Sequence, residues 1–153
     1  MNSERSEKIS GVFVGIFEKL AFMFGDEVSK DEIPVPTGDL IEASMSFTGF
    51  RSGSLGLALP RDVCPVISAN VLGIDVDDDV AIERSLDALK EVLNVICGNL
   101  LTEIEGEEPI FDLTVPETRI VSKAEWAGLL ENDDTMAFVV DEEPVLLYLR
   151  IGE

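Results

Sequence analysis

A helix-like pattern occurs twice in the chain, at an offset of 73 positions. Both copies read Glu-x-Leu-x-x-x-x-Gly followed by Asp or Asn, which aligns Glu18 with Glu91, Leu20 with Leu93 and Gly25 with Gly98. Self-similarity of this kind predicts two related halves packed about an approximate two-fold axis. Two unrelated amphipathic helices would also align through their common periodicity, so both interpretations stay open. The copies differ where the first has Ala21 and the second has Asn94.

Hydrophobic periodicity predicts a mixed α/β fold. Apolar residues recur at three and four positions in the helical segments, and short apolar runs separated by turn residues indicate hairpins. The predicted helices cover 9–24, 61–72 with Asp62 as its cap, and a long segment from the Asp77–Asp79 run to about Glu105; the predicted hairpins pair 40–47 with 54–59 and 136–140 with 145–151, and 110–121 is extended. We expect a single domain over residues 1–153, with helices flanking a largely antiparallel sheet of about five or six strands.

Charge and hydropathy narrow the class of partner. The chain has a formal charge of −20, which would repel nucleic acid phosphates and anionic lipid headgroups. Its 46% apolar residues are enough to build a folded core. No apolar stretch reaches the length that spans a bilayer, and the N-terminus lacks a signal-peptide pattern. We therefore expect a cytoplasmic protein whose partner is a protein or a small molecule, without nucleic acid or membrane.

The chain contains no histidine. This excludes catalytic triads, cysteine–histidine pairs and zinc sites built on histidine. The two cysteines, Cys64 and Cys97, lie in apolar surroundings without a Cys-x-x-Cys spacing, so we expect buried thiols and no metal site. Any catalysis must use carboxylates, amides, hydroxyls or lysine, or groups that a partner supplies.

The long helical segment carries two faces. One is an apolar stripe that should face the core, formed by Ile82, Leu86, Leu89, Leu93, Ile96 and Leu100. The other is a set of residues at the same three-four spacing, here called the polar ridge: Asp87, Glu91, Asn94 and Gly98. Glycine inside a helix costs about 1 kcal/mol relative to alanine, so Gly98 suggests that something approaches the backbone there. The alternative is a solvated face whose polar residues are arbitrary.

The polar ridge resembles the signature of the CheC, CheX and FliY phosphatases of bacterial chemotaxis. That signature is similar to Asp/Ser-x-x-x-Glu-x-x-Asn followed by a proline, here Asp87, Glu91, Asn94 and Pro116, with a spacing to the proline slightly shorter than the family's. The resemblance extends to Phe17–Phe24 and 111–116 and so covers most of the chain. Ala21 in the first copy makes the chain similar to the single-site CheX kind.

The resemblance implies hydrolysis of the aspartyl phosphate on a CheY-like response regulator. Asn94 would orient the attacking water, and Glu91 would bind a lysine of the partner. Asp87, Gly98 and Asn99 would contribute to partner binding. Mg²⁺ would be held by the partner and no cofactor by this chain, and a homodimer is expected. A non-catalytic module of the same fold, binding a receiver or a flagellar-switch component, is the alternative.

Overall fold

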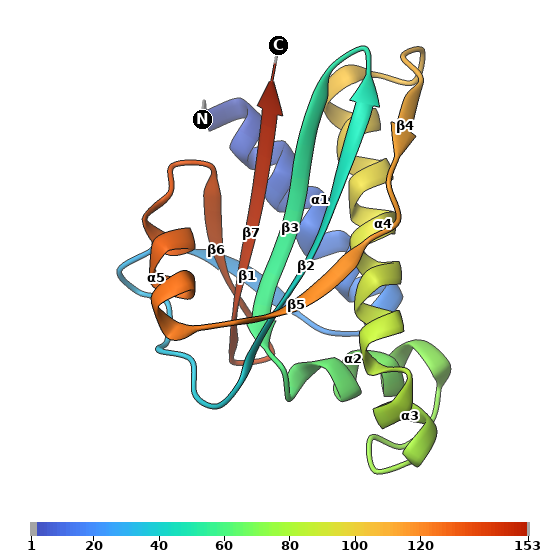
Figure 1. Cartoon of the computed structure of the whole chain (residues 1–153), viewed down its shortest axis with the longest axis vertical. Helices are drawn as coiled ribbons and strands as arrows, with labels where there is room; N and C mark the ends of the chain where they lie inside the picture. Colours follow the sequence, from blue (N-terminus) through green and yellow to red (C-terminus); the bar gives the residue numbers. More distant parts are fainter. Residues whose placement is uncertain (1–2, 153) are drawn as a thin grey trace.

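The computed structural model describes residues 3–152, which form one antiparallel sheet with helices on both faces (Figure 1). The helices are α1 (Ser3–Ala21), α2 (Val63–Leu72), α3 (Asp79–Glu83), α4 (Ser85–Glu105) and α5 (Lys123–Glu131). The strands are β1 (Gly25–Val28), β2 (Leu40–Gly49), β3 (Ser52–Pro60), β4 (Phe111–Leu113), β5 (Glu117–Val121), β6 (Thr135–Val140) and β7 (Glu143–Gly152). The mixed α/β prediction with a largely antiparallel sheet is confirmed, although the described residues form seven strands rather than five or six.

The strand order relates the two halves of the chain. The order is β1-β6-β7-β3-β2-β4, with β5 also paired to β2. If α1 to β3 is taken as the first half and α4 to β7 as the second, β1 pairs with β6, both β4 and β5 pair with β2, and β3 pairs with β7 at the centre. If the strands of the two halves are exchanged, the same strand order results, now read from the opposite edge of the sheet. This topology is the one expected for two related halves about an approximate two-fold axis.

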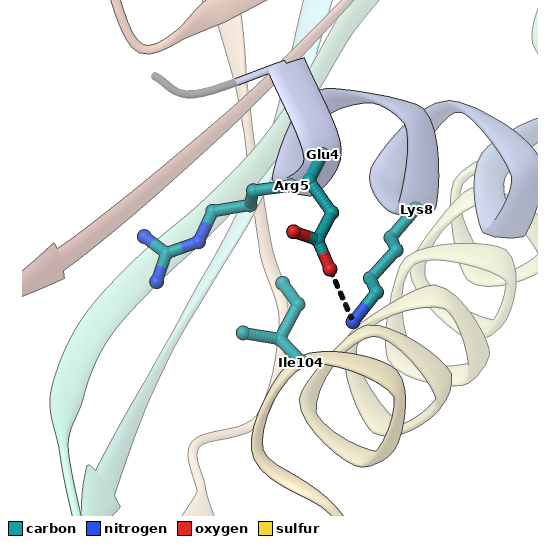
Figure 2. Close-up of a pocket in the computed structure, with 4 residues that line it drawn as sticks. All are labelled: Glu4, Arg5, Lys8 and Ile104. Atoms are coloured by element: carbon teal, nitrogen blue, oxygen red, sulfur yellow. Dashed lines mark ion pairs between the residues drawn. The ribbon is translucent and has the colours of Figure 1, made fainter.

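The core lies between the sheet and the helices α1, α2 and α4. Because side chains alternate along a strand, the central strands β2, β3, β6 and β7 bury side chains on both faces of the sheet. The larger cluster includes Phe13, Leu57, Leu89 and Phe138, whereas the smaller one on the opposite face surrounds Trp126 of α5. Helices α1 and α4 run in opposite directions (Figure 1), and side chains from the start of α1 and the end of α4 line one hollow (Figure 2).

Helix α1 ends earlier than the periodicity predicts. Phe22 takes a left-handed backbone conformation with φ of 53°, which stops the helix at Ala21. The chain then enters β1, so Gly25 begins a strand where the sequence predicted only the close of a helix. A strand of four residues with two exposed acidic side chains carries too little pattern to be recognised.

The long helical segment is divided into α3 and α4 at Arg84, which lies outside the helical region with φ of −97° and ψ of 8°. The break changes the phase of the helix, so Ile82 is 54% exposed and its assignment to the core stripe is wrong. The acidic run does begin a helix, because Asp78 accepts a hydrogen bond from the backbone of Val80 at 2.8 Å. Asp62 does lie at the N-cap position of α2, as predicted, but its side chain makes no capping hydrogen bond there.

Candidate active site on helix α4

Helix α4 is held by one apolar side along its length. Leu89, Leu93, Ile96 and Leu100 are each at most 1% exposed, as the stripe predicts. The residues between them on the other side of the helix face solvent. A helix buried along a single stripe is fixed in rotation, since turning it would expose these side chains to water. The sequence therefore determines which α4 residues can meet a partner.

The polar ridge lies on the exposed side of α4. Asp87, Glu91, Asn94 and Gly98 are all exposed, and successive members lie one turn apart. Within residues 3–152, no hydrogen bond or ion pair engages the side chains of Asp87, Glu91 or Asn94. A carboxylate and an amide one turn apart, with all their hydrogen-bonding groups available, can together engage one polar site on another molecule.

Gly98 and Asn99 extend this surface toward the end of α4. A Cβ atom at Gly98 would meet nothing within 4 Å, so no other part of the described chain comes close to the helix backbone there. The Asn99 amide donates to the Val95 carbonyl at 2.8 Å, which leaves its oxygen free to accept from a partner. Both residues are exposed, as contact with a partner would require.

The first copy of the repeated pattern has an exposed Glu18 but no exposed side chain at the position that corresponds to Asn94. At the offset of 73, Ala21 corresponds to Asn94, but Ala21 is fully buried at the end of α1. The first copy thus lacks an exposed amide one turn after its glutamate. The last element of the signature, Pro116, is half-buried in the segment between β4 and β5.

Within residues 3–152, neither the cysteines nor a cluster of metal ligands adds a second candidate site. Burial raises the pKa of the Cys64 thiol to about 12 and that of Cys97 to about 11, so both are protonated and unreactive at neutral pH. In the part of the chain that is described, no three His, Cys, Asp or Glu side chains come together as metal ligands. Nor is any helix within 3–152 long and apolar enough to cross a bilayer.

A surface hollow lies where the start of α1 meets the end of α4. Glu4 and Lys8 point toward Ile104 there, and the Lys8 Nζ and Glu4 Oε1 atoms are 3.8 Å apart (Figure 2). Both side chains are substantially exposed, and such a pair contributes at most about 1 kcal/mol to stability. This hollow is therefore lined by an exposed ion pair that adds little to stability. It lies at the opposite end of α4 from Asp87.

One further feature of α4 was missed by sequence reasoning. A pocket of about 170 Å³ begins at Gly98 and is bounded by the chain that follows the helix. The pocket depends on where β4 runs, and that is set by its pairing with β2, which is distant in sequence. The only sequence signal for it was the glycine in the helix interior.

Comparisons with known proteins bear on the same elements. Residues 41–129 match the sequence profile of the family described as chemotaxis phosphatase CheX. No curated protein sequence matches the chain.

Solved structures resemble the whole fold. A CheX from Desulfovibrio desulfuricans has a TM-score of 0.69 at 15% identity, covering 97% of this chain and 99% of that one. The CheX–CheY complex with BeF3 and Mg²⁺ from Borrelia burgdorferi gives 0.66 at 15% identity, over 97% and 98%. A CheX from Vibrio vulnificus gives 0.67 at 13% identity, over 98% and 97%. Because the profile match spans more than half of the chain, the protein belongs to the CheX family of chemotaxis phosphatases.

Proposed function

We propose that this chain hydrolyses the aspartyl phosphate of a CheY-like response regulator, in the cytoplasm with that regulator. The observation that carries the proposal is the exposed, unpaired Glu91 and Asn94 one turn apart on a helix whose other side is buried. Membership of the CheX family and the likeness to a CheX solved with CheY support the same activity. The chain supplies the polar ridge, and the receiver supplies the phosphoaspartate, a lysine and bound Mg²⁺.

Asn94 is the proposed catalytic residue. Its amide would orient a water molecule in line with the phosphorus–oxygen bond of the phosphoaspartate. The water oxygen forms the new bond to phosphorus, the aspartyl oxygen leaves as a carboxylate, and the water proton goes to the released phosphate or to solvent. Phosphoryl transfer depends mainly on positioning and charge stabilisation, so a chain without histidine is not at a disadvantage.

Glu91 is the proposed docking residue. Its carboxylate would bind the ammonium group of the receiver's lysine, which fixes the position of Asn94 relative to the phosphoryl group. Asp87, one turn earlier, adds negative charge at the edge of this contact. Gly98 and Asn99 complete the surface that the receiver meets.

The activity is tested by adding the purified protein to a phosphorylated CheY-like receiver and following phosphate release. Release should be faster than the receiver's own decay and should depend on the amount of protein added. An unchanged rate of decay with clear binding of the receiver would instead identify a non-catalytic binding module.

Replacing Glu91 with Ala is expected to weaken receiver binding by about 2 kcal/mol, roughly thirtyfold in Kd, with a smaller effect on turnover at saturation. The reason is that Glu91 makes a charged contact present before and during the reaction. Glu131→Ala removes an exposed carboxylate from α5, on the other face of the sheet, and serves as the control. Equal Kd values for the two variants would contradict the docking role of Glu91.

We also propose that the protein forms a homodimer through the edge of the sheet at β5. Strand β5 pairs with β2 on one side, and its Ile120 is 67% exposed. An open strand edge can pair with a second copy. Ile120→Asp is expected to shift the protein toward the monomer in sedimentation, whereas Val35→Asp, in an exposed loop, should not. A wild-type protein that sediments as a monomer at high concentration would refute this proposal.

A further inference from the structure

The pocket beside Gly98 lies in line with the polar ridge. Its walls come from the last two turns of α4 and from the chain that follows, and its lining is mainly apolar: Gly98, Leu101, Thr102, Gly106, Glu107, Pro109, Phe111 and Leu113. Gly98 is both the last residue of the polar ridge and the first of the pocket. A molecule bound over Glu91 and Asn94 therefore reaches the pocket within one helical turn.

The far wall of the pocket is fixed by strand pairing. Phe111 pairs with Gly49 of β2, and its ring packs edge-on against Phe47 with centroids 5.9 Å apart. Gly49 has φ of 139°, and a Cβ there would lie 2.5 Å from the Ile110 carbonyl oxygen. The close approach of β4 to β2 thus requires glycine, and it holds the wall in place before any partner binds.

Nothing within the described chain requires glycine at position 98. The helix runs through it without a break, and its missing side chain would point into open space. Glycine in a helix interior is normally unfavourable relative to alanine. The cost is explained if the space above Gly98 is used by another molecule.

The size and the charge of the pocket beside Gly98 indicate which kind of side chain fits into it. A cavity of about 150 Å³ can hold a benzene ring, so the 170 Å³ here accommodates one large apolar side chain. Leu113 at its mouth is 40% exposed, and the neighbouring Ile110 is 84% exposed. Glu107 lines the pocket, and Glu103 and Glu108 are exposed close by in the sequence. An apolar pocket with a carboxylate in its lining is complementary to an apolar side chain flanked by lysine or arginine.

We propose that this pocket binds an apolar side chain of the receiver, flanked by basic residues, and so anchors the receiver over Glu91 and Asn94. The inference rests on the proposed function and adds a second point of attachment to it. Two contacts separated along α4 fix an orientation that a single charged contact leaves free. A larger side chain at position 98 would take up open space beside the pocket that Gly98 lines, which is why this position is chosen for the test.

The test compares Gly98→Leu with Gly128→Leu. Gly128 is also an exposed helical glycine at which an added Cβ would meet nothing within 4 Å, but it lies in α5 on the other face of the sheet. Both substitutions should raise the melting temperature by about 2 to 4 °C, because leucine favours the helix more than glycine. Only Gly98→Leu should raise KM for the phosphorylated receiver, by tenfold or more, with kcat unchanged.

A second variant tests the apolar wall without filling the pocket. Leu113→Ser should raise KM severalfold at unchanged kcat, and Kd for the receiver activated with BeF3 and Mg²⁺ should rise in parallel. The inference is overturned if both Gly98→Leu and Leu113→Ser have KM within twofold of wild type while wild type is active. It is also overturned if these variants change only the sedimentation of the protein, since the pocket would then bind a second copy. If wild type itself does not accelerate phosphate release, the proposed function fails and this inference fails with it.

Discussion

Replacing Asn94 with Ala is expected to lower kcat for phosphate release from the phosphorylated receiver by about 100- to 1,000-fold. Loss of one well-placed group that acts on a transition state costs about 3 to 4 kcal/mol. Asn94 is exposed and unpaired, so its removal leaves no buried group without a partner. The melting temperature should therefore stay within about 2 °C of wild type. Single-turnover release of phosphate, with the protein in excess over the receiver, measures the effect.

The chemistry of the amide can be separated from its size. Asn94→Asp keeps the shape of the side chain but replaces its NH2 group, with two N–H donors, by a second oxygen and adds a negative charge. This variant should be as inactive as Asn94→Ala. Asn94→Gln keeps the amide but moves it by one methylene, and it should retain partial activity. Asn70→Ala, at a half-buried position on α2, is a control for the loss of an amide elsewhere. A kcat for Asn94→Ala within threefold of wild type would refute the catalytic role.

The sequence could predict the candidate site because the site lies on one helix. Spacings of three and four residues place Asp87, Glu91, Asn94 and Gly98 on one face, and the apolar stripe on the other side settles which face is buried. Both facts are local, so neither depends on knowing the fold. The prediction that the polar ridge is exposed is confirmed, whereas the chemical roles of its residues stay predictions until tested.

The pairing of distant segments could not be predicted in the same way. The pocket beside Gly98 exists because β4 pairs with β2, which requires glycine at position 49 and the edge-on contact of Phe111 with Phe47. The buried carboxylate of Glu42 is a second case, since its partner Arg119 lies 2.7 Å away on a neighbouring strand. A single sequence gives no signal for either pairing.

Local backbone changes account for the remaining errors. Periodicity predicted one helix through Arg84, but the non-helical conformation of this residue rotates Ile82 out of the core. The internal offset of 73 positions aligns Glu18 with Glu91, which are both exposed, but it also aligns buried Ala21 with exposed Asn94. The two halves are nevertheless related in the strand order, which depends on the succession of elements and not on an exact helical phase.

Replacing Phe13 with Ala is expected to lower the free energy of unfolding by about 3 to 5 kcal/mol. Phe13 is fully buried, and its ring stacks on Phe138 of β6 with centroids 4.0 Å apart and contacts Phe17 at 4.8 Å. Truncation removes these contacts and leaves a cavity between the helix layer and the sheet. Urea unfolding measures the change directly, and the melting temperature should fall by roughly 10 °C or more. Phe50→Ala, at a 62% exposed position in a hairpin turn, should change stability by at most about 0.5 kcal/mol.

The same variant separates stability from catalysis. Phe13 holds α1 of the first half against β6 of the second, whereas α4 is held against the core by its own buried residues Leu89, Leu93 and Ile96. Well below its melting temperature, Phe13→Ala should therefore keep the wild-type kcat, because the polar ridge is still in place. Asn94→Ala should show the reverse, with normal stability and almost no turnover. If Phe13→Ala loses activity while fully folded, the position of α4 depends on α1, and the polar ridge is not set by the packing of its own helix.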